Sequence, residues 1–155
     1  MWRRLGRLSV IALAVAGADQ LLKAVMVPWL QDGPVTVIPG FARLILAYNT
    51  GAAFSSFAGV AGARWALVGA TLVALAVAVW AAAGPLGRHR GTLWSLALIC
   101  GGAMGNLIDR LRLGSVVDFV DLYAGNWHWP VFNLADAAIT VGGVYLAWTL
   151  IRGKA

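Results

Sequence analysis

Long apolar segments alternate with short polar ones along this chain. The segments 65–87 and 91–108 contain no charged residue, and each approaches or exceeds the roughly 20 apolar residues that cross a bilayer as one helix. The last apolar segment begins at Pro130, a residue that helices accept in their first turn. The pattern therefore predicts four membrane-spanning helices, at about residues 8–27, 65–87, 91–111 and 130–151.

The first apolar segment also has features of a cleavable signal peptide. Basic residues precede a short apolar stretch that ends at the small residues 14–16, as in a secretory leader. Apolar character resumes over residues 21–29, however, and completes a full crossing length. We therefore favour a retained first helix, with cleavage as the alternative.

Composition indicates a membrane protein with one domain. Of the 155 residues, 61% are hydrophobic, only 12% are charged and eight are tryptophan. This composition is not that of a soluble domain, and the length leaves room for one domain, residues 1–155. The single cysteine, Cys100, excludes a disulfide framework or a cysteine metal cluster within one chain.

Basic residues gather near the ends of the predicted spans. The three groups are Arg3, Arg4 and Arg7; Arg88 and Arg90; and Arg152 and Lys154. Because such residues stay on the cytoplasmic side, we expect both termini and the middle loop there and the two longer loops outside. The net charge of +6 comes mostly from this bias, and the arginines do not form one face with interleaved aromatics, so we expect no nucleic-acid binding.

The first long loop contains strand-forming residues. Val35–Ile38 and Phe41–Tyr48 are separated by the turn signal Pro39-Gly40. So short a segment cannot bury a core of its own and must rest on the helices or the membrane surface. The expected fold class is an all-α polytopic membrane protein, with four transmembrane helices and a small extracytoplasmic β-rich cap at about residues 28–64.

Polar residues within the predicted spans gather near their outer ends. Asn106, Asp109 and Arg110 share one helical face near the end of the third span. Asp136 lies less than two turns after the start of the last span, and the inner halves of the spans are almost entirely apolar. This convergence predicts one shared site that opens to the outside.

Two pairs of opposite charges near these ends are expected to be structural. Asp19 and Lys23 are four residues apart, and Asp109 directly precedes Arg110. Breaking a buried ion pair is costly whether or not the pair takes part in catalysis, so both are expected to fix helix register. In the second long loop, residues 127–129 contain two tryptophans and a histidine and are expected to form an aromatic belt at the membrane interface.

Asp118 and Asp136 are the candidate catalytic pair in a chain without glutamate. Placing a charged side chain near the bilayer core costs about 2.5 to 3.5 kcal/mol of insertion free energy, so carboxylates at these positions are expected to have a function. Two carboxyl groups that share one proton can take a proton from water and donate one to a scissile carbonyl, which hydrolyses a peptide without a metal. Asp121 would face away from Asp118 on a strand and is expected to be a solvated loop charge. Asn106 and Asn133 can serve a carboxylate or join two helices, and both roles stay open.

Two other classes of protein also place aspartates in a membrane. A small proton-coupled transporter or channel uses them as a proton relay, although a relay should extend through the whole membrane depth. A structural membrane subunit uses buried ion pairs for assembly. The transporter is the main alternative to the peptidase.

Five motifs together resemble those of lipoprotein signal peptidase, the signal peptidase II family. They are Asp19–Lys23, Asn49–Phe54, Gly101–Arg110, Val116–Phe119 and Phe132–Asp136. Each motif alone is short, but the five occur in order on four spans and cover nearly the whole chain.

This resemblance implies an aspartic endopeptidase of the bacterial inner membrane, which removes signal peptides from prolipoproteins on the amino side of a diacylglyceryl-modified cysteine. Asp118 and Asp136 match the catalytic pair of the family. The positions that match residues lining or surrounding the site are Asn106, Arg110, Asn133, Asp19, Lys23 and Asn49. The family uses no metal and no cofactor. Prolipoprotein and membrane lipid are the expected partners, an apolar groove is expected to admit the acyl chains laterally, and we expect a monomer.

Overall fold

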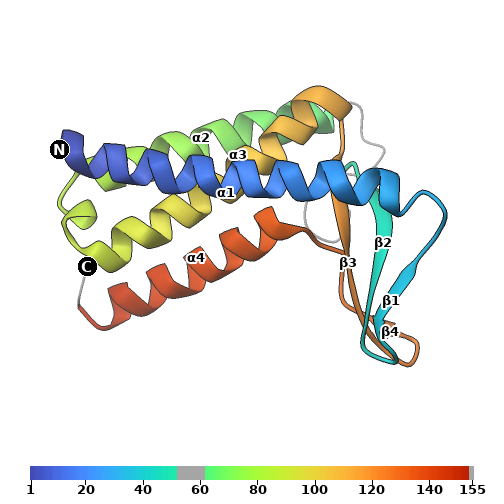
Figure 1. Cartoon of the computed structure of the whole chain (residues 1–155). Helices are drawn as coiled ribbons and strands as arrows, with labels where there is room; N and C mark the ends of the chain where they lie inside the picture. Colours follow the sequence, from blue (N-terminus) through green and yellow to red (C-terminus); the bar gives the residue numbers. More distant parts are fainter. Residues whose placement is uncertain (52–61, 154–155) are drawn as a thin grey trace.

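Four long helices run side by side, and a small sheet packs at one end of them (Figure 1). The computed structural model describes residues 1–51 and 62–153. The helices are α1 (Trp2–Trp29), α2 (Ala63–Ala83), α3 (Arg90–Leu113) and α4 (Leu134–Ile151), with the short 3-10 helix η2 (Leu86–Arg88) between α2 and α3. All four long helices are apolar and long enough to cross a membrane. The start of α1 and the end of α4 lie at the end of the bundle away from the sheet (Figure 1).

The last helix begins later than the sequence suggested. Helix α4 starts at Leu134, not at Pro130, because Asn133 caps it. The Asn133 side chain accepts a hydrogen bond from the Asp136 backbone, and the Asp136 side chain accepts one from the Asn133 backbone, which is a reciprocal capping box. Asp136 therefore lies in the first turn of α4, and the expected start of the last span at residue 130 is wrong.

The sheet draws on both long connections between helices. Its strands are β1 (Val35–Ile38), β2 (Ala42–Asn49), β3 (Val116–Ala124) and β4 (Trp127–His128), antiparallel and in the order β1-β2-β3-β4. The first two strands match the expected cap, whereas the expected cap did not include β3 and β4. The pairing of β2 with β3 sets Asn49 opposite Val116 and Ala47 opposite Asp118. This register brings the end of β2 next to Asp118.

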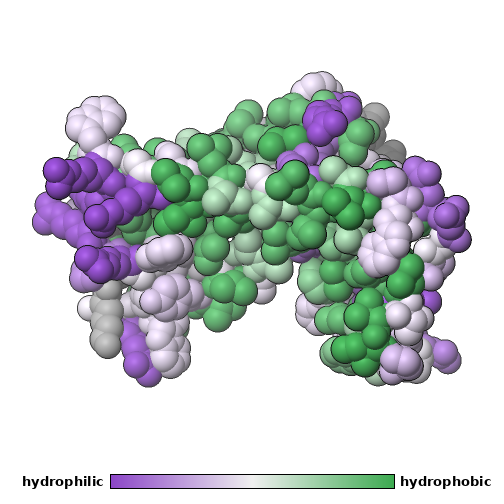
Figure 2. All heavy atoms as spheres, in the orientation of Figure 1, coloured by the Kyte–Doolittle hydropathy of each residue, from purple (hydrophilic) through white to green (hydrophobic). Residues whose placement is uncertain are grey.

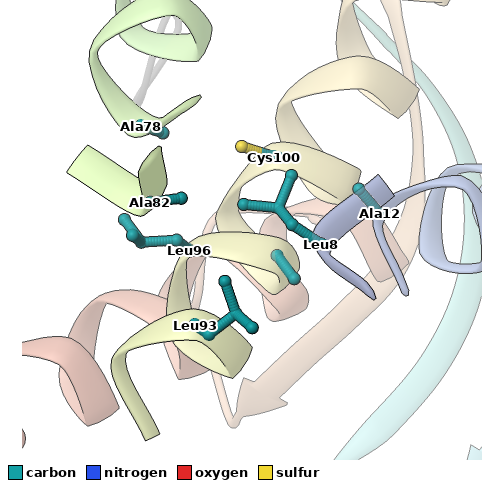
Figure 3. Close-up of a cluster of buried hydrophobic side chains, with 8 residues drawn as sticks. Leu8, Ala12, Ala78, Ala82, Leu93, Leu96 and Cys100 are labelled. Atoms are coloured by element: carbon teal, nitrogen blue, oxygen red, sulfur yellow. The ribbon is translucent and has the colours of Figure 1, made fainter. Parts of the chain in front are cut away.

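Helix α3 is the centre of the bundle, and it packs against the other three long helices. A buried apolar cluster joins α1, α2 and α3 (Figure 3). Its members are Leu8, Ala12, Ala78, Ala82, Leu93, Leu96, Ala97 and Cys100. The small side chains allow the helix backbones to approach closely, as is common in membranes.

Two glycines of α3 permit close contacts near the sheet end. A Cβ atom on Gly105 would lie 2.6 Å from Asp19 Oδ2 of α1, and one on Gly102 would overlap the backbone oxygen of Ala135 in α4. The glycine-rich segment thus serves close helix packing. It also lets charged and polar groups of α1 and α4 approach α3.

Large hydrophobic side chains cover the outer faces of the helices. On the face shown in Figure 2 hydrophobic residues cover the middle of the bundle, and hydrophilic residues gather at the end where α1 begins. Side chains with more than half of their surface exposed include Val10, Leu13, Leu72, Trp80 and Val144. A water-soluble monomer rarely exposes so large an apolar surface, so this belt supports a multi-pass membrane protein.

Candidate active site

Asp118 and Asp136 line one cleft where the sheet meets the helices. Asp118 comes from β3 and Asp136 from the first turn of α4, and the cleft between the elements has a volume of about 280 Å³. Other residues that line it are Asn49, Asn106, Arg110, Trp129, Pro130, Phe132, Ile139 and Thr140. Two carboxyl groups from segments distant in sequence thus face the same space.

Amide side chains connect the two carboxylates. Asn133 Nδ2 donates to Asp118 Oδ1 at 2.7 Å and to Asn106 Oδ1 at 3.1 Å. Asn106 Nδ2 in turn donates to Asp136 Oδ1 at 2.8 Å. Both asparagines are buried, so the hydrogen bonds form without competition from bulk water. The structure shows both roles left open for these amides, because they bind the carboxylates and the same bonds join α3 to the start of α4.

Asn49 approaches Asp118 from the other side. Its Nδ2 donates to Asp118 Oδ2 at 3.3 Å, while its Oδ1 accepts from the backbone nitrogen of Gly51 at 3.0 Å. The second bond holds the amide with its nitrogen toward the carboxylate. Residues 52–54 of the motif that begins at Asn49 lie outside the described residues.

Burial sets the protonation of Asp118. Its side chain is nearly inaccessible, and burial together with the negative charge of Asp136 raises the pKa of Asp118 to about 7, against hydrogen bonds from Asn49 and Asn133 and the charge of Lys23. Asp136 occupies a different setting, because the first turn of a helix favours a negative charge. The two carboxyl groups are therefore not equivalent.

A buried ion cluster lies directly behind the dyad. Lys23 Nζ contacts Asp19 Oδ2 at 2.8 Å and Asp109 Oδ2 at 2.7 Å, and it donates to Asn106 Oδ1 at 3.2 Å. Asp19 Oδ1 accepts from the backbone nitrogen of Ala135 at 3.0 Å. The cluster thus positions Asn106 and the first turn of α4, and the predicted pair of Asp19 with Lys23 is confirmed.

The predicted pair of Asp109 with Arg110 is wrong. Adjacent residues on a helix point in different directions, so Asp109 turns toward Lys23 of α1 while Arg110 turns to the cleft. Arg110 has no ion pair among residues 1–51 and 62–153 and adds a positive charge to the cleft wall.

Asp121 differs from its expected role as a solvated loop charge. Its side chain is buried, and Asp121 Oδ2 lies 2.6 Å from Arg43 Nε while Oδ1 lies 2.9 Å from His128 Nδ1. These partners lower the pKa of Asp121 although burial acts to raise it. His128 also stacks on Tyr123, so it joins the sheet strands and is more than a residue of an aromatic belt. Asp121 is not among the residues that line the cleft.

Sequence reasoning missed Gln20 and the wall formed by Trp129, Pro130 and Phe132. Gln20 Nε2 donates to Asp109 Oδ1 at 2.8 Å and to the backbone oxygen of Gly105 at 3.1 Å. Its position between Asp19 and Lys23 of one motif was the available signal. Nothing local in the sequence marked the wall, because it forms only when the chain after β4 folds back on the cleft.

The described part of the chain contains no group of three or more His, Cys, Asp or Glu residues arranged to hold a metal.

Comparison with known proteins identifies the family. The family model described as signal peptidase (SPase) II matches residues 11–152 of this chain. The chain belongs to the signal peptidase II family. This membership confirms the family resemblance that the five motifs indicated. The same family is named peptidase A8, and A8 peptidases are aspartic peptidases, so the protein is a protease of the aspartic class. The proton-coupled transporter and the structural subunit are set aside.

Individual relatives agree with the family. The chain is 47% identical over 139 residues to the lipoprotein signal peptidase of Cupriavidus necator, in an alignment of 87% of this chain and 77% of the relative. It is 44% identical over 147 residues to the lipoprotein signal peptidase of an Azoarcus species, with 92% of this chain and 81% of the relative aligned.

Solved structures agree with the fold of this signal peptidase II family member. A bacterial membrane enzyme solved by the in meso method at 1.9 Å resolution superposes with a TM-score of 0.85 at 28% identity, over 95% of this chain and 94% of that one. A second such structure, at 2.3 Å resolution, has a TM-score of 0.84. The arrangement of four helices and a small sheet is therefore shared with a membrane enzyme.

Proposed function

We propose that this peptidase removes signal peptides from prolipoproteins, cleaving on the amino side of a diacylglyceryl-modified cysteine with water activated by Asp118 and Asp136. The observation that carries the proposal is the placement of these two carboxyl groups on one cleft, joined through the amides of Asn106 and Asn133. The names of the relatives supply the substrate class.

The inequivalence of the two carboxyl groups assigns their roles. Asp118 holds the shared proton near neutral pH, because burial raises its pKa to about 7. Asp136, in the first turn of α4, is the anionic partner. Asp136 takes a proton from water as the oxygen attacks the scissile carbonyl carbon, and Asp118 gives its proton to the carbonyl oxygen. The resulting gem-diol collapses when the proton on Asp136 moves to the amide nitrogen, a hydroxyl proton returns to Asp118 and the C–N bond breaks.

Arg110 and Asn49 are placed to hold the substrate beside the dyad. The Arg110 guanidinium lines the cleft and can bind a peptide carbonyl or a lipid ester oxygen. Asn49 is at the end of β2, on the side of the cleft that faces the sheet, and supports Asp118. Holding the scissile bond in a fixed orientation supplies a large part of the rate gain in such enzymes.

The proposed orientation sets the sheet and the dyad at the extracytoplasmic face of the bacterial inner membrane. Arginines near both termini and in the α2–α3 connection favour the cytoplasm for the opposite end. A diacylglyceryl group in the outer leaflet would then hold the adjacent peptide bond at the level of the cleft. Thr140 lines both the cleft and an apolar groove of about 500 Å³ along α4, which extends to Trp148 and supports a lateral path for acyl chains.

One chain suffices for this proposed chemistry. Both carboxyl groups and the amides that bind them belong to the same polypeptide. We therefore propose that the enzyme acts as a monomer, with prolipoprotein and membrane lipid as its partners.

The activity is expected to fall as the pH rises above about 7. Protonated Asp118 is the proton donor in the proposed mechanism, so its loss above its pKa of about 7 should reduce kcat/KM about tenfold per pH unit. Asn49→Ala removes a hydrogen bond that lowers this pKa, so the alkaline limb of its profile should move to higher pH. A kcat/KM profile from pH 5 to 10 measures both effects, and a flat profile across pH 7 to 9 would contradict the assignment of the donor.

A matched pair of substrates tests the proposed function. Purified enzyme in detergent receives a diacylglyceryl-modified prolipoprotein or its unlipidated twin, and mass spectrometry locates the cut. We expect cleavage of the lipidated form only, directly before the modified cysteine. Equal cleavage of both forms would show that the enzyme does not recognise the lipid. Cleavage of neither form by folded enzyme would refute the proposed substrate class.

A further inference from the structure

A second groove lies at the end of the bundle that carries the termini, far from the dyad. It has a volume of about 780 Å³ and lies between the first turns of α1 and α3. Three arginines and three apolar residues among its lining residues are Arg3, Arg7, Arg90, Val10, Ile11 and Leu93. Figure 2 shows hydrophilic residues gathered at this end of the molecule.

The arginines of this groove have no partner within the described residues. Neighbouring Arg4 donates to the backbone oxygen of Gly84 at 2.9 Å and so joins α1 to the end of α2. Arg3, Arg7 and Arg90, in contrast, are exposed and form neither an ion pair nor a side-chain hydrogen bond within residues 1–51 and 62–153. Arg3 and Arg7 are also four residues apart on one helical face, where like charges repel.

No acidic residue lies near this end in the chain. The acidic side chains of the protein are Asp19, Asp32, Asp109, Asp118, Asp121 and Asp136. The nearest to the groove along α1 is Asp19, which is about 18 Å of helix beyond Arg7 and is already paired with Lys23. The groove is therefore a concentration of positive charge that no acidic side chain of residues 1–51 and 62–153 neutralises.

The other half of the groove is apolar and accessible. Val10 is 68% exposed and Trp94 is 53% exposed, and both line the groove beside the buried Leu93. Gly6 forms part of the wall, and a Cβ atom on it would meet nothing within 4 Å. The same cavity thus offers cations at the end of the bundle and an apolar surface toward its middle.

We propose that this groove binds one anionic phospholipid, with its phosphate against Arg3, Arg7 and Arg90 and an acyl chain along Val10 and Leu93. Arginine binds phosphate oxygens through paired hydrogen bonds, and basic pockets between membrane helices are suited to anionic head groups. The apolar half distinguishes a lipid from a free phosphate, which would use the arginines alone. An acidic peptide would also find cations here, but the apolar surface runs toward the middle of a membrane-spanning bundle, where acyl chains lie.

Native mass spectrometry of the purified full-length protein tests the proposal. The protein in detergent is titrated with phosphatidylglycerol, phosphatidylcholine or glycerol 3-phosphate. We expect phosphatidylglycerol to bind at least about tenfold more tightly than either of the others. Equal binding of the two lipids, or equally tight binding of glycerol 3-phosphate, would refute an anionic lipid site.

Matched variants separate this site from a general effect of charge. Arg7→Gln with Arg90→Gln should abolish the preference for phosphatidylglycerol, whereas Arg88→Gln with Arg152→Gln removes the same charge outside the groove and should keep it. An equal loss in both double variants would overturn the proposal.

A second pair of variants tests the apolar half without changing charge. Gly6→Phe fills the groove and should weaken phosphatidylglycerol binding at least about tenfold, because the side chain occupies the path of the acyl chain. Gly17→Phe, at another open position of α1, should bind as the wild type does. Full binding by Gly6→Phe would refute the lipid path. Cleavage of the prolipoprotein in detergent shows that each variant is folded.

Discussion

Asp118→Asn and Asp136→Asn are each expected to reduce kcat for prolipoprotein cleavage about a hundredfold to ten-thousandfold. Either substitution removes one half of the proton exchange, the general base or the general acid, and such groups contribute roughly 10² to 10⁴ in rate. Asparagine keeps the size of the side chain. Substrate binding should change little in either variant, because the cleft walls and Arg110 are unchanged.

Folding must be measured beside turnover in these variants. Both oxygens of Asp118 accept hydrogen bonds, from Asn133 and Asn49, so an amide there sets one NH₂ group against a donor. Thermal unfolding in detergent reports this cost. Asp121→Asn is the matched control, since it removes a buried carboxylate from the same strand outside the cleft, and it should keep kcat within about an order of magnitude. A folded Asp118→Asn or Asp136→Asn enzyme with comparable activity would rule out the dyad.

Lys23→Met is expected to cause the largest loss of stability among the single substitutions proposed for this protein. It leaves the carboxylates of Asp19 and Asp109 buried without their cation, which costs about 3 to 5 kcal/mol. For a protein of this size such a loss lowers the unfolding midpoint by on the order of 10 °C. Activity should fall as well, because Lys23 also donates to Asn106, which binds Asp136.

Two further variants show whether the unpaired charges cause this loss. Arg112→Met removes an exposed cation near the same end of α3, and its midpoint should change by no more than a few degrees. Adding Asp19→Asn and Asp109→Asn to Lys23→Met neutralises the whole cluster and should recover part of the stability. If Lys23→Met unfolds at the same temperature as Arg112→Met, the cluster does not stabilise the bundle.

Much of the helical architecture and the candidate dyad was predictable from local sequence. The segments from 65 to 87 and from 91 to 108 are apolar over a membrane-crossing length, so they can hardly form anything except long helices. Asp19 and Lys23 are four residues apart on one helix, where their pairing requires no knowledge of the rest of the fold. Asp118 and Asp136 stood out because carboxylates are rare and costly beside such segments.

Features that depend on distant parts of the chain were not predictable in this way. Asp109 lies beside Arg110 in sequence, yet it pairs with Lys23 because α1 and α3 pack closely at Gly105. Asp121 is a polar residue in a connection, yet it is buried because β2 and β4 bring Arg43 and His128 to it.

The sequence by itself thus determined which segments form apolar helices of membrane-crossing length, which family the motifs resemble and which carboxylates need a function. Only the tertiary structure decided how the groups meet. The amide of Asn133 both ends the connection into α4 and binds Asp118, so the start of the helix and the geometry of the dyad depend on one contact between distant segments. Local patterns report the preference of a segment for water or lipid, whereas the partner of a buried polar group is set by the packing of the whole chain.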